Sequence, residues 1–321
     1  MREGLVLVTG ASGFVGRALC ERLAACGHRT RAAMRDGAGT DLRGCDVACI
    51  PDISADTDWT NALTGVATVI HLAARVHVMD EKAPDALAEF RRVNVAGTER
   101  LARSAAANGV KRLVYVSSIK VNGESTCGND RFAESDAPSP QDPYGISKYE
   151  AELALHRIAD ETGLEVVILR PPLIYGAGVK GNFAQMLKVL ARGIPLPLAS
   201  VRNLRSLVYV GNMVDAAIAC AAHPAAAGQT YLVSDGEDVS TPELLRRLGA
   251  AMGCSAKLFP CPSSWLRLAG HLTGKSEQIG RLQESLRIDS GKIRRQLNWN
   301  PPYSLQQGLQ ATAEWYRNTH P

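Results

Sequence analysis

The chain has 321 residues, 45% of them hydrophobic, which is enough for one large domain with a smaller one beside it. Its longest apolar runs have strand length and fall short of the roughly 20 residues that a membrane span needs, so we expect no stable membrane insertion. The formal net charge of +4 is mild and does not argue for nucleic acid as a partner. The eight cysteines are scattered without zinc spacing and no signal peptide is evident. These features favour a reduced, cytoplasmic protein without a metal site.

Strand and helix patterns alternate through the first half of the chain. Short apolar runs predict strands at Leu5–Thr9, Thr30–Met34, Val47–Ile50, Thr68–Ala73, Arg112–Ser117 and Glu165–Arg170. Apolar residues at helical spacing predict helices at Phe14–Cys26, Phe90–Asn108 and Tyr144–Thr162. Strands that alternate with helices predict the α/β class with a doubly wound, parallel Rossmann sheet.

A glycine-rich turn separates the first strand from the first helix. Its sequence, Thr-Gly-Ala-Ser-Gly-Phe-Val-Gly at positions 9–16, places glycines three residues apart. Glycine permits a tight turn and lets the backbone approach a pyrophosphate, while the helix N-terminus supplies free N–H groups. The turn therefore predicts a dinucleotide site. Its expected members are Gly10, Ser12, Gly13, Phe14, Val15 and Gly16.

The second half of the chain is less regular. Its patterns predict strands at Ser206–Val210 and Thr230–Val233, and helices at Pro242–Met252, Pro262–Leu272 and Leu305–Arg317. The chain is expected to return to the sheet near residue 206, so the two units are interleaved. We assign residues 1–175 and about 206–235 to the nucleotide-binding Rossmann domain. Residues 176–205, approximately, and 236–321 are assigned to a smaller, mostly helical substrate domain.

Seven motifs occur in the order that extended short-chain dehydrogenases show. They are the glycine-rich turn, His71-Leu72-Ala73-Ala74, Asn94 in Asn-Val-Ala-Gly-Thr, Ser117-Ser118, Tyr144 with Lys148, Arg170 to Gly176, and Leu297 to Pro302. The chain resembles the NAD-dependent epimerase/dehydratase family, whose founding type is UDP-galactose 4-epimerase, over almost its whole length. The resemblance implies a nucleotide-sugar enzyme with a nicotinamide dinucleotide. The cofactor contacts that it implies outside the turn are Asp52, Ile53, Leu72, Ala73, Ala74, Asn94, Ser117 and Pro171.

The end of the second predicted strand bears on the type of cofactor. An NAD enzyme usually has an acidic residue there to bind the ribose 2′-hydroxyl, but this chain has Met34 followed by Arg35. The guanidinium fork of arginine suits a 2′-phosphate. The sequence therefore favours NADP(H), with NAD(H) possible, and Asp36 is interpreted as a turn residue.

Tyr144 and Lys148 lie four residues apart in a predicted helix and so share one face. A nearby ammonium and a positive nicotinamide ring would lower the tyrosine pKa from about 10. Tyr144 could then exchange a proton with a sugar oxygen while nicotinamide exchanges hydride at the same carbon. Ser118 is expected to hydrogen-bond the reacting oxygen, which gives Ser118, Tyr144 and Lys148 as catalytic residues. Asn94 is expected mid-helix, supporting the Lys148 side.

The residues after Ser118 indicate which reaction is disfavoured. Dehydratases of the resembled family carry an Asp-Glu pair at this place, whereas this chain has Ile119 and Lys120. Neither can act as a carboxylic acid, which leaves epimerisation or carbonyl reduction.

For the sugar nucleotide, the resemblance implies a UDP-sugar. Candidate contacts are Arg75, Ser118, Lys120, Tyr144, Asn182, Arg205 and Arg281. Asn182 and Arg205 take the places of residues that hold the diphosphate in this family.

Details are most similar to bacterial enzymes that reduce UDP-4-keto-6-deoxy-N-acetylglucosamine, a step in lipopolysaccharide O-antigen synthesis. Spacing does not separate this reductase from a UDP-glucose or UDP-N-acetylglucosamine 4-epimerase that retains NAD. Dihydroflavonol- and steroid-type reductases share the turn and the Tyr–Lys pair, and a dinucleotide-sensing regulator shares the fold. A homodimer is possible, because the helix that begins at Tyr144 often forms a dimer contact in this class.

Overall fold

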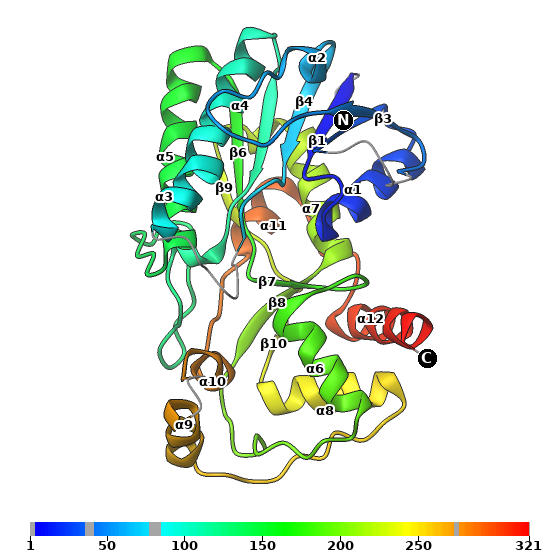
Figure 1. The fold of residues 1–321 in the computed structure, drawn as a ribbon, viewed down its shortest axis with the longest axis vertical. Coiled ribbons are helices and arrows are strands. Elements are labelled where there is room, and N and C mark those ends of the chain that lie inside the picture. Colours follow the sequence, from blue (N-terminus) through cyan, green and yellow to red (C-terminus); the bar gives the residue numbers. More distant parts are fainter. Residues whose placement is uncertain (1–3, 36–41, 77–84, 273–275, 321) are drawn as a thin grey trace.

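The computed structural model describes residues 4–35, 42–76, 85–272 and 276–320, and these form two layers of structure one above the other (Figure 1). The upper layer is built on a seven-stranded sheet in the order β3-β2-β1-β4-β5-β6-β9. All neighbouring strands in it are parallel. The strands are β1 (Leu5–Thr9), β2 (Thr30–Met34), β3 (Cys45–Cys49), β4 (Val66–His71), β5 (Arg112–Val116), β6 (Glu165–Arg170) and β9 (Thr230–Leu232).

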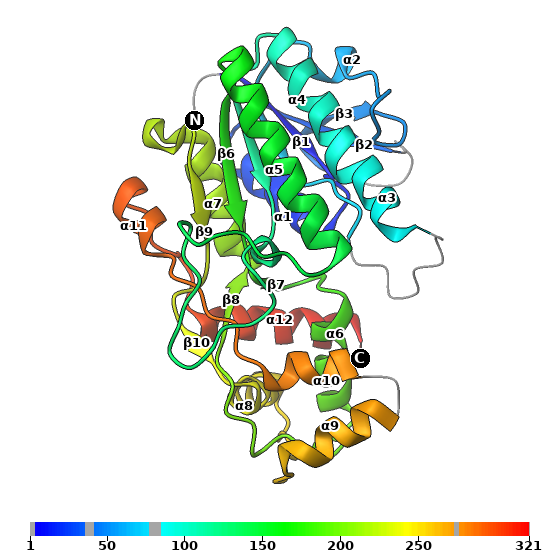
Figure 2. The ribbon, with the colours of Figure 1, turned by 90° about the vertical axis from the view of Figure 1, so that its left-hand side faces the viewer.

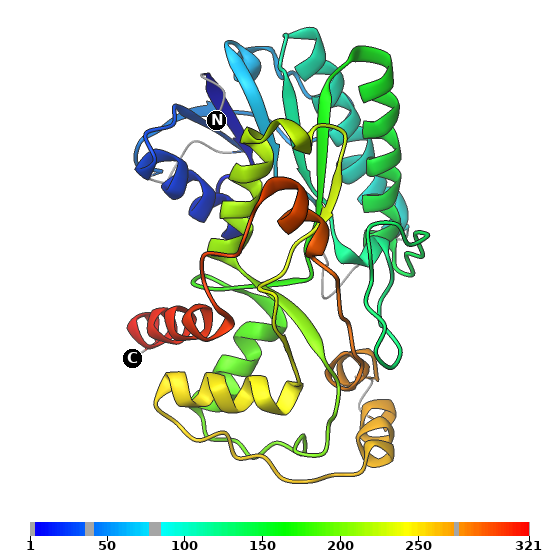
Figure 3. The ribbon, with the colours of Figure 1, turned by 180° about the vertical axis from the view of Figure 1, so that it is seen from behind.

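Helices cover both faces of this sheet, because its strands are apolar on both sides. On one face lie α1 (Phe14–Ala25) and α7 (Val210–Ala222), which Figure 3 shows in blue and yellow-green. On the other lie α4 (Gly97–Ala107) and α5 (Pro143–Thr162), seen together in Figure 2. Short segments complete this layer: α2 (Thr60–Leu63), α3 (Ala86–Phe90), the π-helical turn Arg91–Ala96, the 3-10 turns Ile119–Val121 and Pro224–Ala226, and α11 (Gly291–Leu297).

Alternate side chains of a strand enter different cores, as the strand period of two requires. Val6 and Val8 of β1 belong to the core beneath α1 and α7, which includes Leu19. Leu5 and Leu7 of the same strand belong to the core beneath α4 and α5. The predicted doubly wound Rossmann sheet is therefore confirmed.

The lower layer has a three-stranded sheet in the order β10-β8-β7. Its strands are β7 (Leu173–Tyr175), β8 (Arg205–Tyr209) and β10 (Asp238–Val239). The helices around it are α6 (Gly181–Ala191), α8 (Thr241–Met252), α9 (Ser263–Leu272), α10 (Ser276–Gln283) and α12 (Leu305–Thr319). A separate core, which contains Phe183, Leu187 and Leu248, holds this layer together.

The return of the chain to the large sheet differs from the expectation. The predicted strand at Ser206–Val210 exists as β8, but it pairs with β7 and β10 in the small sheet. The chain rejoins the large sheet only at β9, which follows α7 and the turn Pro224–Ala226 and pairs with β6. The predicted domain limits stay a prediction. Over the described residues, no helix has both the length and the apolar character that crossing a membrane demands.

Candidate active site

The turn between β1 and α1 is closed by glycines. Gly10 has φ +67°, and a Cβ there would lie 2.8 Å from the backbone nitrogen of Ala73. A Cβ on Gly16 would overlap the carbonyl oxygen of Gly10, while the Gly13 nitrogen donates to that same oxygen at 2.9 Å. Gly13 is the N-cap of α1 and has no side chain to occupy the first N–H groups of the helix. The turn thus fits a pyrophosphate, which Gly10, Ser12, Gly13, Phe14, Val15 and Gly16 would hold.

We expect Gly16→Ala to weaken dinucleotide binding about tenfold or more, because the added carbon would force the turn open at Gly10. Calorimetric titration with NAD measures this. Gly109→Ala is the matched control: Gly109 has φ +74° and open space around its Cβ position, so alanine there adds only the strain of a left-handed backbone, roughly 1–2 kcal/mol. Equal NAD affinities for Gly16→Ala and the wild type would contradict this view of the turn.

The turn lies at the point where the strand order reverses. β2 pairs with one edge of β1 and β4 with the other, and ligands of such sheets bind at the carboxyl ends of these strands. The Leu72 nitrogen donates to the Thr9 carbonyl at 3.3 Å, and the Ala73 nitrogen to the Thr9 hydroxyl at 3.3 Å. The predicted cofactor segment Leu72–Ala74 is therefore beside the glycine turn.

The residues predicted for the adenosine end lie after β2 and β3. Arg35 is exposed directly after β2, and Asp36 lies outside the described residues. Asp52 forms an ion pair of 3.0 Å with Arg92, and this hydrogen bond lowers the pKa of Asp52. Ile53 is buried, and its side chain occupies the space where Gly97 lacks a Cβ. Asp52 thus has a partner within the protein already.

Tyr144 occupies the first turn of α5. The helix starts there because Asp142 is its N-cap, accepting from the Gly145 nitrogen at 2.6 Å, and Pro143 follows with no N–H to satisfy. This start brings the Tyr144 hydroxyl near Ser118, just beyond the end of β5, where the two can share a hydrogen bond. Burial, with a smaller contribution from Asp142, raises the pKa of Tyr144 to about 12, and the Ser118 hydrogen bond acts in the opposite direction.

Lys148 is 2% exposed, and its side chain extends to the end of β5. Its ammonium donates to the Tyr115 hydroxyl at 3.0 Å and to the Val116 carbonyl at 2.7 Å. Burial lowers the pKa of Lys148 to about 7, while the charge of Glu152 acts in the opposite direction. In the protein without its cofactor, burial dominates and raises the pKa of Tyr144, so the expected lowering by this ammonium and a bound nicotinamide ring stays a prediction.

The Lys148 pKa makes a prediction about stability and pH. In the unfolded chain a lysine titrates near ~10.4, so between pH 7 and about 10 the unfolded state binds more protons and the free energy of unfolding rises with pH. Below pH 7 Lys148 is charged in the folded protein too, so the cost of burying the ammonium lowers the free energy of unfolding by its full amount. Lys148→Met should therefore stabilise the protein relative to wild type most at pH 6.5, with a difference that shrinks by up to ~1.4 kcal/mol per pH unit above pH 7. Urea unfolding at several pH values measures it, and a pH-independent difference would refute it.

Asn94 lies in the π-helical turn before α4, inside the predicted helix. Its side chain is bonded on both sides: Oδ1 accepts from the Arg75 nitrogen at 2.8 Å, and Nδ2 donates to the Arg75 carbonyl and to Ser147, each at 3.0 Å. Asn94 thus joins the segment after β4 to α5 at the residue before Lys148. Both contacts with Arg75 involve its backbone, so they do not bear on the predicted contact of its side chain with the substrate.

A buried ion pair next to this site was not found from the sequence. Glu152 of α5 accepts from Arg170 at 2.5 Å, and both side chains are under 10% exposed. Ser117 donates to Glu152 at 2.5 Å, and Arg170 also donates to Asn122 at 3.0 Å. The hydroxyl of Ser117 is therefore already engaged by a carboxylate of α5. The only sequence signal was a glutamate four residues after Lys148, on the same helix face.

The predicted substrate residues are partly brought together. Lys120 is paired with Glu124 at 2.9 Å and with Asp142, so its charge is neutralised at the start of α5. Arg205 donates to the carbonyls of Arg281 and Glu284, at 2.9 and 3.1 Å, which places it at the end of α10. Burial, and then the charge of Arg281, lower the pKa of Arg205. Asn182 is exposed in the first turn of α6.

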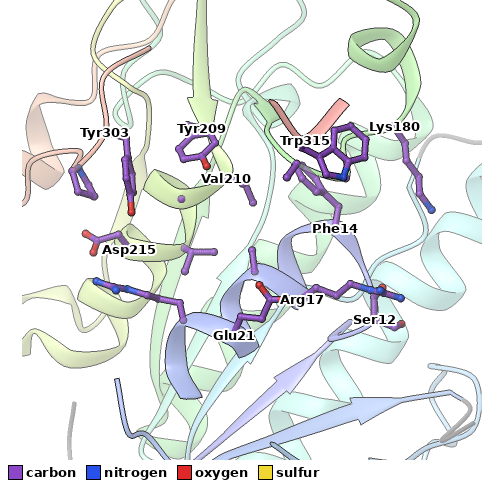
Figure 4. A pocket seen from close by; sticks show the side chains of 17 residues that line it. Ser12, Phe14, Arg17, Glu21, Lys180, Tyr209, Val210, Asp215, Tyr303 and Trp315 are labelled. Atoms are coloured by element: carbon purple, nitrogen blue, oxygen red, sulfur yellow. The ribbon is translucent and has the colours of Figure 1, made fainter. Parts of the chain in front are cut away.

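A cavity of about 890 Å³ lies between α1, α7 and α12 (Figure 4). Ser12 and Phe14 reach it from the glycine turn, and Lys180, Tyr303 and Trp315 line it from the lower layer. Ser118, Tyr144 and Lys148 do not line it. The predicted catalytic residues are therefore outside this cavity, one wall of which is formed by α1.

A parallel Rossmann sheet with a glycine turn at its switch point, and a Ser–Tyr–Lys cluster at the next strand end, defines a short-chain dehydrogenase. The model of the NAD dependent epimerase/dehydratase family matches residues 6–234, and the chain belongs to this family. It is an enzyme of that family, with the parallel sheet and helical C-terminal region of its relatives.

Individual relatives cover nearly the whole chain. It is 43% identical over 311 residues to the UDP-glucose 4-epimerase of Vibrio cholerae, covering 96% of this chain and 94% of the relative. It is 30% identical to the UDP-glucose 4-epimerase of Mycolicibacterium smegmatis, covering 97% and 98%. The solved structure of MoeE5 in complex with UDP-glucuronic acid and NAD is 26% identical with a TM-score of 0.79, covering 98% of this chain and all of that one.

Proposed function

We propose that the protein is a UDP-hexose 4-epimerase that keeps NAD bound throughout the reaction and acts on UDP-glucose or UDP-N-acetylglucosamine. The observation that carries the proposal is the neighbouring pair of Ser118, after β5, and Tyr144, in the first turn of α5. Ser118 is followed by Ile119 and Lys120 instead of the Asp-Glu pair of a dehydratase. The 43% identity to a UDP-glucose 4-epimerase over almost the whole chain supports it.

The reaction inverts the carbon that carries the sugar 4-hydroxyl. NAD supplies a hydride acceptor and donor at that carbon when it is bound. Tyr144 would act as tyrosinate, the form that the positive charge of a bound nicotinamide would favour against the raised pKa of the protein alone. In that form it takes the hydroxyl proton as the 4-keto sugar forms, and returns it to the oxygen after the sugar has presented its other face. Ser118 donates a hydrogen bond to the same oxygen and so stabilises the charge that develops there. Lys148 supplies positive charge behind Tyr144, held by Tyr115 and Val116.

Residues near this pair also argue against dehydration. A dehydratase needs a carboxylic acid to protonate the departing hydroxyl. The side chain after Ile119 is instead Lys120, which is bound between Glu124 and Asp142. The closely placed cations Arg205 and Arg281 are our proposed contacts for the diphosphate, with Asn182 as a third.

The test incubates the purified protein with UDP-glucose, with UDP-N-acetylglucosamine, and with a UDP-4-keto-6-deoxy-N-acetylhexosamine plus NADPH. We expect interconversion of the 4-epimers by proton NMR, with no net change in nicotinamide absorbance and with NAD released on denaturation. The opposite pattern would be stoichiometric oxidation of NADPH with the keto sugar and no epimerisation. That result would replace this proposal with the 4-ketoreductase that the sequence details favour.

Arg35 provides a prediction about the cofactor. It is exposed at the end of β2, where its fork could reach a 2′-phosphate. We expect Arg35→Ala to leave NAD affinity within about twofold and to weaken NADP binding about ten- to a hundredfold, since a charge-assisted hydrogen bond is lost only with NADP. Calorimetry with both dinucleotides checks this. Equal losses for NAD and NADP would mean that Arg35 does not select between them, and wild-type protein that binds NADP alone would count against an NAD-retaining epimerase.

A further inference from the structure

A chain of buried polar side chains runs from the dinucleotide turn to the catalytic lysine. The Thr9 hydroxyl lies 2.6 Å from His71 Nδ1, and His71 Nε2 lies 3.0 Å from the Thr98 hydroxyl. Thr98 is a neighbour of Tyr115 whose hydroxyl lowers the pKa of that tyrosine, and the Tyr115 hydroxyl accepts from Lys148 at 3.0 Å. Five different elements, β1, β4, α4, β5 and α5, thus each contribute one polar side chain.

Every member of this chain is removed from water. Thr9, Thr98 and Tyr115 are 0% exposed, His71 is 1% and Lys148 is 2%. A buried hydroxyl or ammonium without a partner is destabilising, so each group depends on its neighbours for its hydrogen bonds. The ring of Tyr115 adds two contacts, since His71 stacks on it at 5.6 Å and the Lys148 ammonium lies 4.3 Å from its centre. Tyr115 is therefore the member that fixes where the ammonium sits.

Because hydroxyl hydrogens can rotate, this series of hydrogen bonds can adapt to either charge state of Lys148. Burial lowers the pKa of His71 to about 3, so its ring stays neutral and offers one donor and one acceptor. A charged Lys148 donates to the Tyr115 oxygen, and Tyr115 then donates toward Thr98. A neutral Lys148 can accept from Tyr115 instead, with the hydroxyl hydrogens reversed. Other titratable groups around Lys148 are Glu152 and Tyr144, both on α5.

We propose that Tyr115 is a positioning residue for the reaction: its hydroxyl, oriented by Thr98 and His71, holds the Lys148 ammonium at the end of β5 and stabilises its charged form. Val116 supplies the other acceptor from the backbone, at 2.7 Å, so Tyr115 is the side chain that a mutation can remove. The kinetic consequence rests on the proposed function. The effect on Lys148 itself does not depend on it.

Tyr115→Phe tests the proposal, because it removes the acceptor and keeps the ring. We expect kcat for 4-epimerisation to fall about tenfold, the size of one charge-assisted hydrogen bond, with KM for the UDP-sugar and the bound NAD content unchanged. The alkaline limb of the kcat profile should move to lower pH, since the charged form of Lys148 loses an acceptor. Tyr231→Phe is the matched control: that buried tyrosine hydroxyl bonds Gln296 at 3.0 Å, away from this chain.

Variants of Thr98 test whether more distant members of the hydrogen-bond series also influence Lys148. Thr98→Val keeps the shape and removes the hydroxyl, and we expect a smaller fall in kcat that Thr98→Ser reverses. In the double variant with Tyr115→Phe, Thr98→Val should add little, because the hydroxyl that it orients is already gone. Additive losses would mean that Thr98 acts independently of Tyr115.

A readout without substrate separates failure of this inference from failure of the proposed function. Lysines labelled with ¹³C at Cε, with Lys148 assigned from Lys148→Met, give its titration midpoint by NMR. We expect a lower midpoint in Tyr115→Phe than in wild type, and an unchanged one in Tyr231→Phe. An unchanged midpoint in Tyr115→Phe would overturn the inference. A lowered midpoint in a protein that does not epimerise UDP-sugars would uphold the inference and overturn only the proposed function.

Discussion

Tyr144→Phe is expected to lower kcat for 4-epimerisation by about a thousandfold, within the range that general acid–base catalysis contributes. The phenol oxygen is the group that meets the Ser118 hydroxyl at the end of β5, and phenylalanine keeps the ring while removing that oxygen. The ring also packs edge-on against Phe90, with centroids 6.1 Å apart, so the variant should fold normally. Steady-state kinetics with UDP-glucose, together with the NAD content after denaturation, measure the loss.

A second tyrosine on the same helix gives the control. Tyr149 lies five residues further along α5, where it is partly exposed. Tyr149→Phe should keep kcat within about twofold, since surface changes away from special features have small effects. If Tyr144→Phe retained similar activity, Tyr144 would not transfer the proton. If it lost bound NAD as well as kcat, its role would be in holding the cofactor.

The parts of the site that sequence predicted well are those set by local geometry. Gly13 and Gly16 approach the backbone of Gly10 and Ala11 within the same turn, whereas the close approach at Gly10 is to Ala73, which follows β4. Tyr144 and Lys148 share a helix whose start is marked by Asp142 and Pro143. The six strands expected in the first half are present for the same reason, since each is a short apolar run between turn residues.

The parts that sequence did not predict depend on pairing between distant segments. β8 looks like any buried strand, and nothing in residues 205–209 indicates that its partners are β7 and β10 and not the large sheet. The expectation that Arg205 binds phosphate stays a prediction, but its hydrogen bonds to the carbonyls of Arg281 and Glu284, about eighty residues later, had no signal in the sequence. Such contacts follow from the fold and leave no local pattern. The pairing of Glu152 with Arg170 belongs to this group.

Glu152→Gln is expected to destabilise the protein by about 3–5 kcal/mol, because it leaves the Arg170 guanidinium charged and buried without its counter-ion. Arg170 would keep Asn122 as a neutral partner, which cannot offset the charge. Ser117 would lose its carboxylate acceptor at the same time, at the end of β5 next to Ser118. The shift of the urea midpoint, followed by circular dichroism, measures the loss.

The same helix provides a matched control for this prediction. Glu150 pairs with Arg91 at 2.5 Å, as closely as Glu152 pairs with Arg170, but its partner side chain is 50% exposed. Glu150→Gln should therefore change stability by less than about 1 kcal/mol, because water solvates the arginine that remains. Replacing both buried partners, in Glu152→Leu with Arg170→Met, should recover much of the loss, because no unpaired charge is left inside. Equal effects of Glu152→Gln and Glu150→Gln would mean that burial does not set the strength of the pair. A double variant as unstable as Glu152→Gln would mean instead that the hydrogen bonds of Ser117 and Asn122, and not the charge, account for the loss.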